Sequence, residues 1–168
     1  MAFIDQEKAF DAVNRDKSWA VLKDYGVCGE LLDAKRALFN DSKCAARRKS
    51  GLTDWFNTTS GVRQGCVLSP LLFIVYVNRI TKEAIPNNYE INELLFAHDQ
   101  CLIHENEDGL QSHIRESNSA CSKYDMKISI EKTETMIIRR EPINRNITIK
   151  NAELNQVDHL KCLIVEKT

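Results

Sequence analysis

The amino-acid sequence predicts a mixed α/β (α+β) fold of the ferredoxin-like type, with strands and helices in the order βαββαβ. Three observations support this prediction. A short apolar strand is expected at residues 2–4, two strand-like runs at 91–96 and 100–104 are joined tightly, and one helical pattern precedes that pair while another follows it. With 168 residues, 43% of them apolar, the chain is long enough to bury a core as one domain without disulfides or structural metals.

The segment after the first strand predicts two helices and a hairpin. Asp16 is a candidate N-cap for a helix that ends at Gly26, and a second helix is expected over residues 30–39. Strands at about 43–49 and 53–58 flank a Ser-Gly pair, which is typical of a β-hairpin. We interpret this segment as an insertion into the βαββαβ order.

A long helix is predicted to begin at Ser69, because a hydroxyl residue followed by Pro70 favours a helix start. It should run to about Ala84, and its first two turns are apolar nearly all round, so we expect the helix to be buried. A polar helix is expected over about 108–124. The remaining strands are predicted at about 126–130, 134–139 and 158–164.

Composition argues against several classes of protein. The chain has 23 basic and 24 acidic residues, and its longest apolar run, residues 71–77, is far shorter than the roughly 20 residues of a membrane helix. Asp5 and Glu7 interrupt any signal-peptide core, and the six cysteines include no CxxC pair. We therefore expect free thiols, no membrane partner and an intracellular location, in the cytoplasm or nucleus.

Basic residues are concentrated in one stretch, since residues 35–49 contain six lysines and arginines but one acidic residue. Lys43, Arg47 and Arg48 in this stretch are candidates for contacts with the phosphates of a nucleic acid. A solvated surface explains the same charges, and charge alone favours that alternative.

Two acidic residues stand at the ends of predicted strands. In a βαββαβ sheet the first strand lies beside the third, so Asp5 and Asp99 should be neighbours although they are 94 residues apart. Carboxylates on rigid supports are the ligands that Mg²⁺ prefers, and phosphoryl transfer commonly uses two such ions about 3.5–4 Å apart.

Four sequence motifs resemble those of reverse transcriptases from non-LTR retrotransposons. Residues 3–11 (Phe-Ile-Asp-Gln-Glu-Lys-Ala-Phe-Asp) resemble motif A, and residues 61–73 (Gly-Val-Arg-Gln-Gly-Cys-Val-Leu-Ser-Pro-Leu-Leu-Phe) resemble motif B. Residues 96–99 (Phe-Ala-His-Asp) occupy the place of motif C, and Lys132-Thr133 that of motif D. The resemblance covers nearly all of the chain.

The resemblance implies that residues 1–168 form a single domain, the palm of a right-hand polymerase, with part of the fingers inserted at 14–60. The upstream fingers, the endonuclease domain and most of the thumb are expected to be absent. The implied activity is RNA-directed DNA synthesis by two-metal nucleotidyl transfer. Its implied partners are an RNA template, a DNA primer and deoxynucleoside triphosphates.

The resemblance also assigns roles to single residues. Asp5 and Asp99 would ligate two Mg²⁺ or Mn²⁺ ions, and Lys132 would protonate or neutralise the leaving pyrophosphate. Contacts with the incoming nucleotide would come from Phe10, as the bulky residue that rejects a ribose 2′-hydroxyl, and from Gln64 and Gly65.

Two departures from the family pattern bear on activity. His98 stands where the family has its second metal-binding aspartate, and a neutral imidazole contributes no charge for Mg²⁺, so the carboxylate charge falls from -3 to -2. Residues 162–164 (Cys-Leu-Ile) replace the Tyr-Leu-Gly of a primer grip. We therefore expect catalysis to be severely reduced.

Three interpretations remain open from the sequence. The chain is an impaired polymerase domain, a non-catalytic remnant that binds nucleic acid, or a degenerate fragment without a role. Primer extension distinguishes the first from the others, and salt-sensitive binding separates the second from the third.

Overall fold

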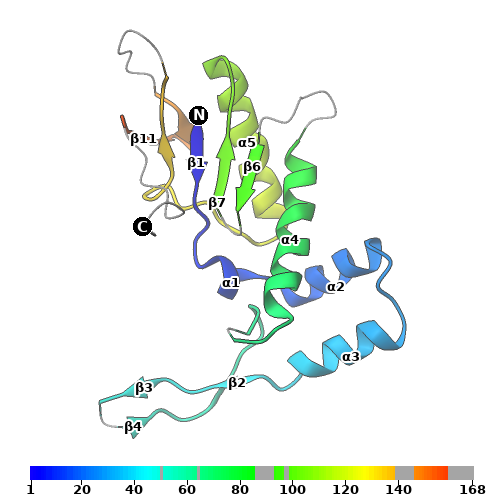
Figure 1. The fold of residues 1–168 in the computed structure, drawn as a ribbon. Helices are drawn as coiled ribbons and strands as arrows, with labels where there is room; N and C mark the ends of the chain where they lie inside the picture. The colour runs from blue at the N-terminus through cyan, green and yellow to red at the C-terminus, as the bar shows by residue number, and fades with distance from the viewer. Residues whose placement is uncertain (50, 64, 86–92, 97–98, 139–145, 159–168) are drawn as a thin grey trace, which may run out of the picture. The chain divides into compact units, whose positions relative to one another are not determined.

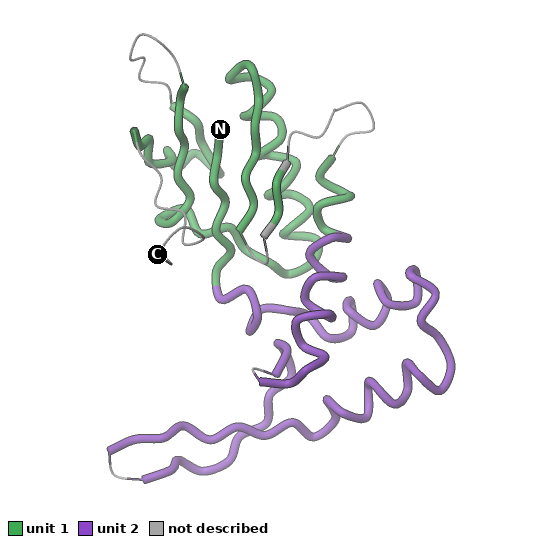
Figure 2. The backbone as a smooth tube through the Cα atoms, in the orientation of Figure 1, with its two compact units in different colours: residues 1–7, 80–168 green, residues 8–79 purple. Residues whose placement is uncertain are grey.

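The computed structural model describes residues 1–168 apart from residues 50, 64, 86–92, 97–98, 139–145 and 159–168 (Figure 1). The chain divides into two compact units, one formed by residues 1–7 and 80–168 and the other by residues 8–79 (Figure 2). The predicted insertion at 14–60 lies within the second unit. None of the helices among the described residues is long and apolar enough to cross a membrane.

The first unit is built on a five-stranded sheet with the order β11-β8-β1-β7-β6 (Figure 1). The central strand β1 (Ala2–Ile4) is antiparallel to β7 (Asp99–Leu102) on one side and to β8 (Glu134–Thr135) on the other. β6 (Glu93–Phe96) pairs with β7, and β11 (Asn155–Gln156) adds an edge strand parallel to β8. The order β8-β1-β7-β6 is the one expected for βαββαβ, which confirms the predicted fold.

Helix α5 (Glu107–Lys123) packs against β7 and against β9 (Thr148–Ile149), which forms a small separate sheet with β10 (Ala152–Glu153). The Asn106 side chain caps α5 by accepting a 2.8 Å hydrogen bond from the Gly109 N–H. Buried side chains recur every three or four residues along α5, as an amphipathic helix requires. They are Leu110, His113, Ile114, Ser117, Ala120 and Cys121.

Two predicted strands of the first unit differ from the structure. The strand expected at 126–130 is reduced to one bridge, between Gln6 and Ile128, because the Thr133 N–H donates to the Ser129 carbonyl and turns the chain away. The strand expected at 134–139 is limited to β8. The strand expected at 158–164 falls almost entirely outside the described residues.

The second unit contains α1 (Ala9–Ala12), α2 (Arg15–Asp24) and α3 (Glu30–Phe39), and α4 (Ser69–Ala84) begins in it. α2 and α3 contact each other, and the rings of Trp19 and Phe39 meet edge to face with centroids 5.7 Å apart. The helix predicted at 30–39 is confirmed.

The predicted N-cap of α2 was wrong. The cap is Asn14, whose backbone is extended and whose side chain accepts a 3.0 Å hydrogen bond from the Lys17 N–H. Asp16 lies in the first turn, where its carboxylate is favoured by the helix dipole but does not cap. The predicted end is confirmed, since Gly26 adopts φ +85° directly after the C-cap residue.

Helix α4 begins and ends as predicted, but it is not buried all round. Leu72, Phe73 and Tyr76 are at most 2% exposed, whereas Leu71 and Ile74 are 52% and 56% exposed. A 3.6-residue repeat places these two groups on different sides of the helix, so an apolar sequence does not ensure burial of every side.

The predicted hairpin is present as two short ladders. β2 (Lys43–Cys44) pairs with β5 (Phe56–Asn57), and β3 (Arg47–Arg48) pairs with β4 (Gly51–Leu52). Two residues separate the ladders on the first strand but three on the second, which constitutes a bulge. Two hydrogen bonds between Ala46 and Thr53 hold the bulge. The Ala46 N–H donates to Thr53 Oγ1 at 2.9 Å, and the Thr53 N–H donates to the Ala46 carbonyl at 3.0 Å.

Candidate active site

The two predicted metal ligands adjoin the same residue pair in the sheet of the first unit, the pair of Ile4 with Gln100. Ile4 pairs with Gln100, so continuing the antiparallel register by one residue places Asp5 opposite Asp99. Side chains of directly opposite residues in an antiparallel pair project to the same face. The strand order therefore brings together two carboxylates that are distant in the sequence.

Asp5 is held by its backbone rather than by its carboxyl group. Its carbonyl accepts a 2.8 Å hydrogen bond from the Ser129 N–H, and its own N–H donates to Thr133 Oγ1 at 3.4 Å. Thr133 is fully buried, so this support is rigid. The Asp5 side chain is 24% exposed, which leaves its carboxylate accessible.

The structure also brings the predicted Lys132 to this place. Lys132 Nζ lies 3.9 Å from Asp5 Oδ1, and the lysine side chain is 72% exposed. An exposed ion pair of this kind contributes at most about 1 kcal/mol, so a cation that binds Asp5 displaces little stabilising interaction.

The donor set fits a hard divalent cation but is short of ligands. Asp5 and Asp99 supply carboxylate oxygens, the chemistry that Mg²⁺ and Mn²⁺ prefer. Within the described ranges, no group of three or more His, Cys, Asp or Glu side chains could hold a metal ion. His98, which stands where the family has its second metal-binding aspartate, lies outside the described residues.

The predicted nucleotide-contact residues belong to the second unit. Phe10 of α1 stacks on Phe73 of α4, with ring centroids 4.3 Å apart and an angle of 19° between the planes. Gly65 adopts φ +82°, and Gln64 falls outside the described residues.

Motifs A and B are joined backbone to backbone at Gly61. The Gly61 N–H donates to the Val13 carbonyl at 2.8 Å, and the Val62 N–H donates to the Phe10 carbonyl at 2.9 Å. Gly61 has φ +78°, and a Cβ added there would lie 2.9 Å from the Asp11 Cα. This position therefore requires glycine for both its conformation and its close contact.

Arg15 fixes the same junction, and sequence reasoning missed it. Its guanidinium donates to the carbonyls of Gly61 at 2.9 Å, Thr58 at 2.7 Å and Ser60 at 3.0 Å. Burial, followed by the charge of Arg63, lowers the pKa of Arg15. One signal could have indicated it, since a basic residue in the first turn of a helix opposes the helix dipole and needs other partners.

The predicted basic contacts lie on the hairpin. Lys43, Arg47 and Arg48 are exposed, and among the described residues no carboxylate forms an ion pair with them. Exposure permits binding to phosphates, and it is also what a solvated surface shows.

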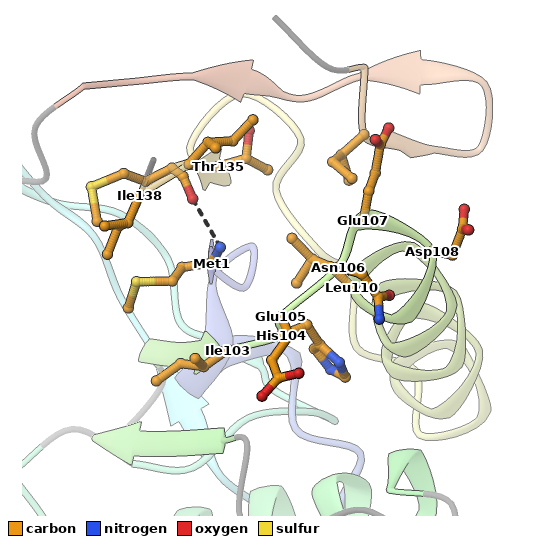
Figure 3. Close-up of a pocket in the computed structure, with 13 residues that line it drawn as sticks. Met1, Ile103, His104, Glu105, Asn106, Glu107, Asp108, Leu110, Thr135 and Ile138 are labelled. Atoms are coloured by element: carbon orange, nitrogen blue, oxygen red, sulfur yellow. Dashed lines mark hydrogen bonds between the residues drawn. The ribbon is translucent and has the colours of Figure 1, made fainter. Parts of the chain in front are cut away.

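A cavity of about 410 Å³ opens at the N-terminal end of α5, and none of the predicted site residues lines it (Figure 3). One of its lining residues, His104, is joined to the buried His113 by a 2.9 Å hydrogen bond between Nε2 and Nδ1. Burial, and next the charge of His104, lower the pKa of His113 to about 4. Burial also lowers the pKa of His104, against the opposing effect of Glu116.

This pair predicts a stability that depends on pH. His113 takes up a proton near pH 6.5 when unfolded but stays neutral to about pH 4 when folded, so stability is full above pH 6.5 and falls as the pH drops through this window. The loss should be about 2–3 kcal/mol. Urea unfolding at several pH values from 7 to 4 measures this loss. The free energy of unfolding should depend less steeply on pH in His113→Phe, because the phenyl ring does not titrate. An equal slope in both proteins would show that other groups cause it.

A βαββαβ sheet with acidic residues beside two paired strands is typical of the palm class of nucleotide polymerases. The family described as reverse transcriptase (RNA-dependent DNA polymerase) matches residues 1–166. The chain belongs to this family.

Curated relatives confirm the resemblance to non-LTR retrotransposon enzymes. The chain is 25% identical over 174 residues to a retrovirus-related Pol polyprotein from a type-1 retrotransposable element R2 of Nasonia vitripennis. It is 26% identical over 148 residues to the type-2 R2DM polyprotein of Drosophila melanogaster. The alignments cover 95% and 84% of this chain but 17% and 14% of those polyproteins, so the chain spans less than a fifth of either.

Solved structures show the same fold. Telomerase from Candida tropicalis, in complex with a fragment of telomeric RNA, matches 79% of this chain and 25% of its own with a TM-score of 0.64 and 18% identity. The corresponding Candida albicans complex covers 92% of this chain and 29% of its own, with a TM-score of 0.64 and 12% identity. The likeness supports the palm fold.

Proposed function

We propose that this chain is the palm of an RNA-directed DNA polymerase, which adds deoxynucleotides to a DNA primer along an RNA template. The observation that carries the proposal is the antiparallel pairing of Ile4 with Gln100, next to Asp5 and Asp99, within a chain of the reverse transcriptase family. We place its action inside the cell, in the cytoplasm or nucleus, where RNA templates occur.

In this proposal Asp5 and Asp99 hold Mg²⁺ or Mn²⁺. The ions supply activation of the primer 3′-hydroxyl and neutralisation of the triphosphate. Lys132, 3.9 Å from Asp5, is close enough to donate a proton to the leaving pyrophosphate or to neutralise it. Phe10, Gln64 and Gly65 would contact the incoming nucleotide, as the family resemblance implies. The stacking of Phe10 on Phe73 supports the role of Phe10, because it gives the ring the fixed orientation that exclusion of a 2′-hydroxyl requires.

We infer that catalysis by this chain is severely reduced, because His98 stands where the family has a metal-binding aspartate and so removes one carboxylate. The second candidate function is binding of nucleic acid without catalysis, which the exposed basic side chains of the hairpin favour.

Primer extension on an RNA template, with Mg²⁺ and separately with Mn²⁺, tests the proposal. The chain alone should give little or no extension, and any extension should disappear in Asp5→Ala because the first ligand is lost. Extension that survives Asp5→Ala would disprove the assigned site.

Binding of nucleic acid should be electrostatic and tolerant of sequence. Arg47→Ala combined with Arg48→Ala should weaken binding and reduce the slope of log affinity against log salt by at most about two units. Binding titrations at several salt concentrations measure the slope. Lys23→Ala with Lys150→Ala, two exposed lysines outside the hairpin, provides the matched control. An unchanged salt slope in the arginine variant would show that Arg47 and Arg48 do not contact phosphates and belong only to a solvated surface.

A further inference from the structure

The hairpin of residues 43–57 exposes large apolar side chains as well as basic ones. Trp55 is 67% exposed, Phe56 52% and Leu52 67%. Single exposed apolar residues are common on protein surfaces, but three on one short hairpin, two of them aromatic, are apolar surface that folding leaves unburied. Leaving an indole in water forgoes one of the largest contributions that a side chain can make to packing. This unburied surface therefore indicates a ligand.

The charge of the hairpin specifies the chemistry of that ligand. Residues 43–57 carry four basic side chains and one acidic one, Asp54, for a net charge of 4 − 1 = +3. In the part of the chain that the structure describes, none of the four basic residues forms an ion pair. An anionic partner with flat apolar faces matches both features, and a nucleic acid is such a partner.

The exposure of the aromatic rings distinguishes between duplex and single strand. The faces of paired bases are covered by their neighbours in a duplex, whereas the bases of an unpaired strand can stack on an aromatic side chain. Phe56 lies opposite Cys44 in the ladder nearest the helices, and Arg47 lies opposite Leu52 in the far ladder (Figure 1). About three residue pairs separate the two positions, or roughly 10 Å, which is the length of a few nucleotides.

We propose that this hairpin binds an unpaired nucleic-acid strand through base stacking on Trp55 and Phe56, together with phosphate contacts from Lys43, Arg47 and Arg48. The inference deepens the proposed function. It rests on that function in one respect, which is the identification of the bound strand as the template ahead of the duplex. The binding itself needs neither a metal ion nor catalysis.

Tryptophan fluorescence tests the proposal directly. The chain has two tryptophans, and Trp19 is only 6% exposed and packs on Phe39. Titration of the full chain with unstructured oligo(dT) or oligo(rU), without divalent metal, should quench the emission of Trp55. Trp55→Phe should still bind, because a phenyl ring also stacks, but its emission should no longer be quenched while Trp19 reports the intact fold.

Binding measured by fluorescence anisotropy of a labelled oligonucleotide separates stacking from charge. Trp55→Ala should weaken binding of the single strand by roughly five- to hundredfold without altering the salt slope. Leu52→Ala, at an equally exposed apolar residue without a π-face, is the matched control and should bind as the unaltered chain does.

Three outcomes would overturn the inference. The first is an equal loss of affinity in Leu52→Ala and Trp55→Ala, which would indicate a general apolar contact. The second is equal affinity for duplex and single strand without quenching of the Trp55 emission. The third is no binding of the oligonucleotide at low salt. Failure of the polymerase proposal is distinguishable, because a chain that binds and is quenched, but whose primer extension survives Asp5→Ala, keeps this inference and loses that one.

Discussion

Replacing His98 with aspartate is expected to raise primer extension by about a hundredfold or more when the flanking polymerase segments are supplied. The change restores the third carboxylate and the -3 charge that two divalent ions need at short separation. Single-turnover extension on an RNA template, with the chain embedded in the corresponding longer protein, measures the effect. In the isolated chain the same change should give little extension, because template and primer remain poorly positioned.

Two further variants make this expectation specific to charge. His98→Asn alters the side chain without adding a negative charge and should not restore extension. Asp5→Ala should abolish extension in the His98→Asp protein. Equal rates for the unaltered and the His98→Asp proteins, with Asp5→Ala inactive in both, would show that His98 does not disable the site.

Gly61→Ala should produce the largest loss of stability among the substitutions considered. A non-glycine residue at φ +78° costs about 1–2 kcal/mol in conformation alone. The new Cβ would also lie 2.9 Å from the Asp11 Cα and 3.0 Å from the Asp11 carbonyl oxygen, which are backbone atoms and cannot rotate away. We expect a total of about 3–5 kcal/mol, measured by urea unfolding followed by circular dichroism.

Gly26→Ala is the matched control for this prediction. Gly26 has a similar φ of +85°, but nothing lies within 4 Å of the added Cβ. Its loss should therefore be limited to the conformational cost of about 1–2 kcal/mol. Equal losses at the two glycines would mean that the contact between motifs A and B carries no stability.

Much of the fold could be predicted because its elements leave local signals. The strand order was accessible from the alternation of helix and strand patterns, since a βαββαβ chain has one common arrangement. Capping and turn residues placed the end of α2 and the start of α4 closely, at Gly26 and Ser69 respectively. The antiparallel neighbours β1 and β7, which Asp5 follows and Asp99 begins, followed from the strand order alone.

The errors arose where tertiary contacts decide between local alternatives. Asn14 and Asp16 are both good caps, and the extended backbone that follows α1 selects Asn14. The apolar sequence of α4 does not reveal which of its sides remains exposed. Arg15 was missed because its role depends on carbonyl groups more than 40 residues away, in the loop at Thr58 to Gly61.

The central claim is that Asp5 and Asp99 form one cation site, and a double-mutant cycle of Mn²⁺ binding tests it most directly. Electron paramagnetic resonance measures free Mn²⁺ in titrations of the His98→Asp chain, in which affinity should be highest. Asp5→Asn and Asp99→Asn should each weaken binding, and the double variant should bind little worse than either single one, because both remove ligands of the same site. Independent, additive losses, or binding unaffected by Asp5→Asn, would contradict the account.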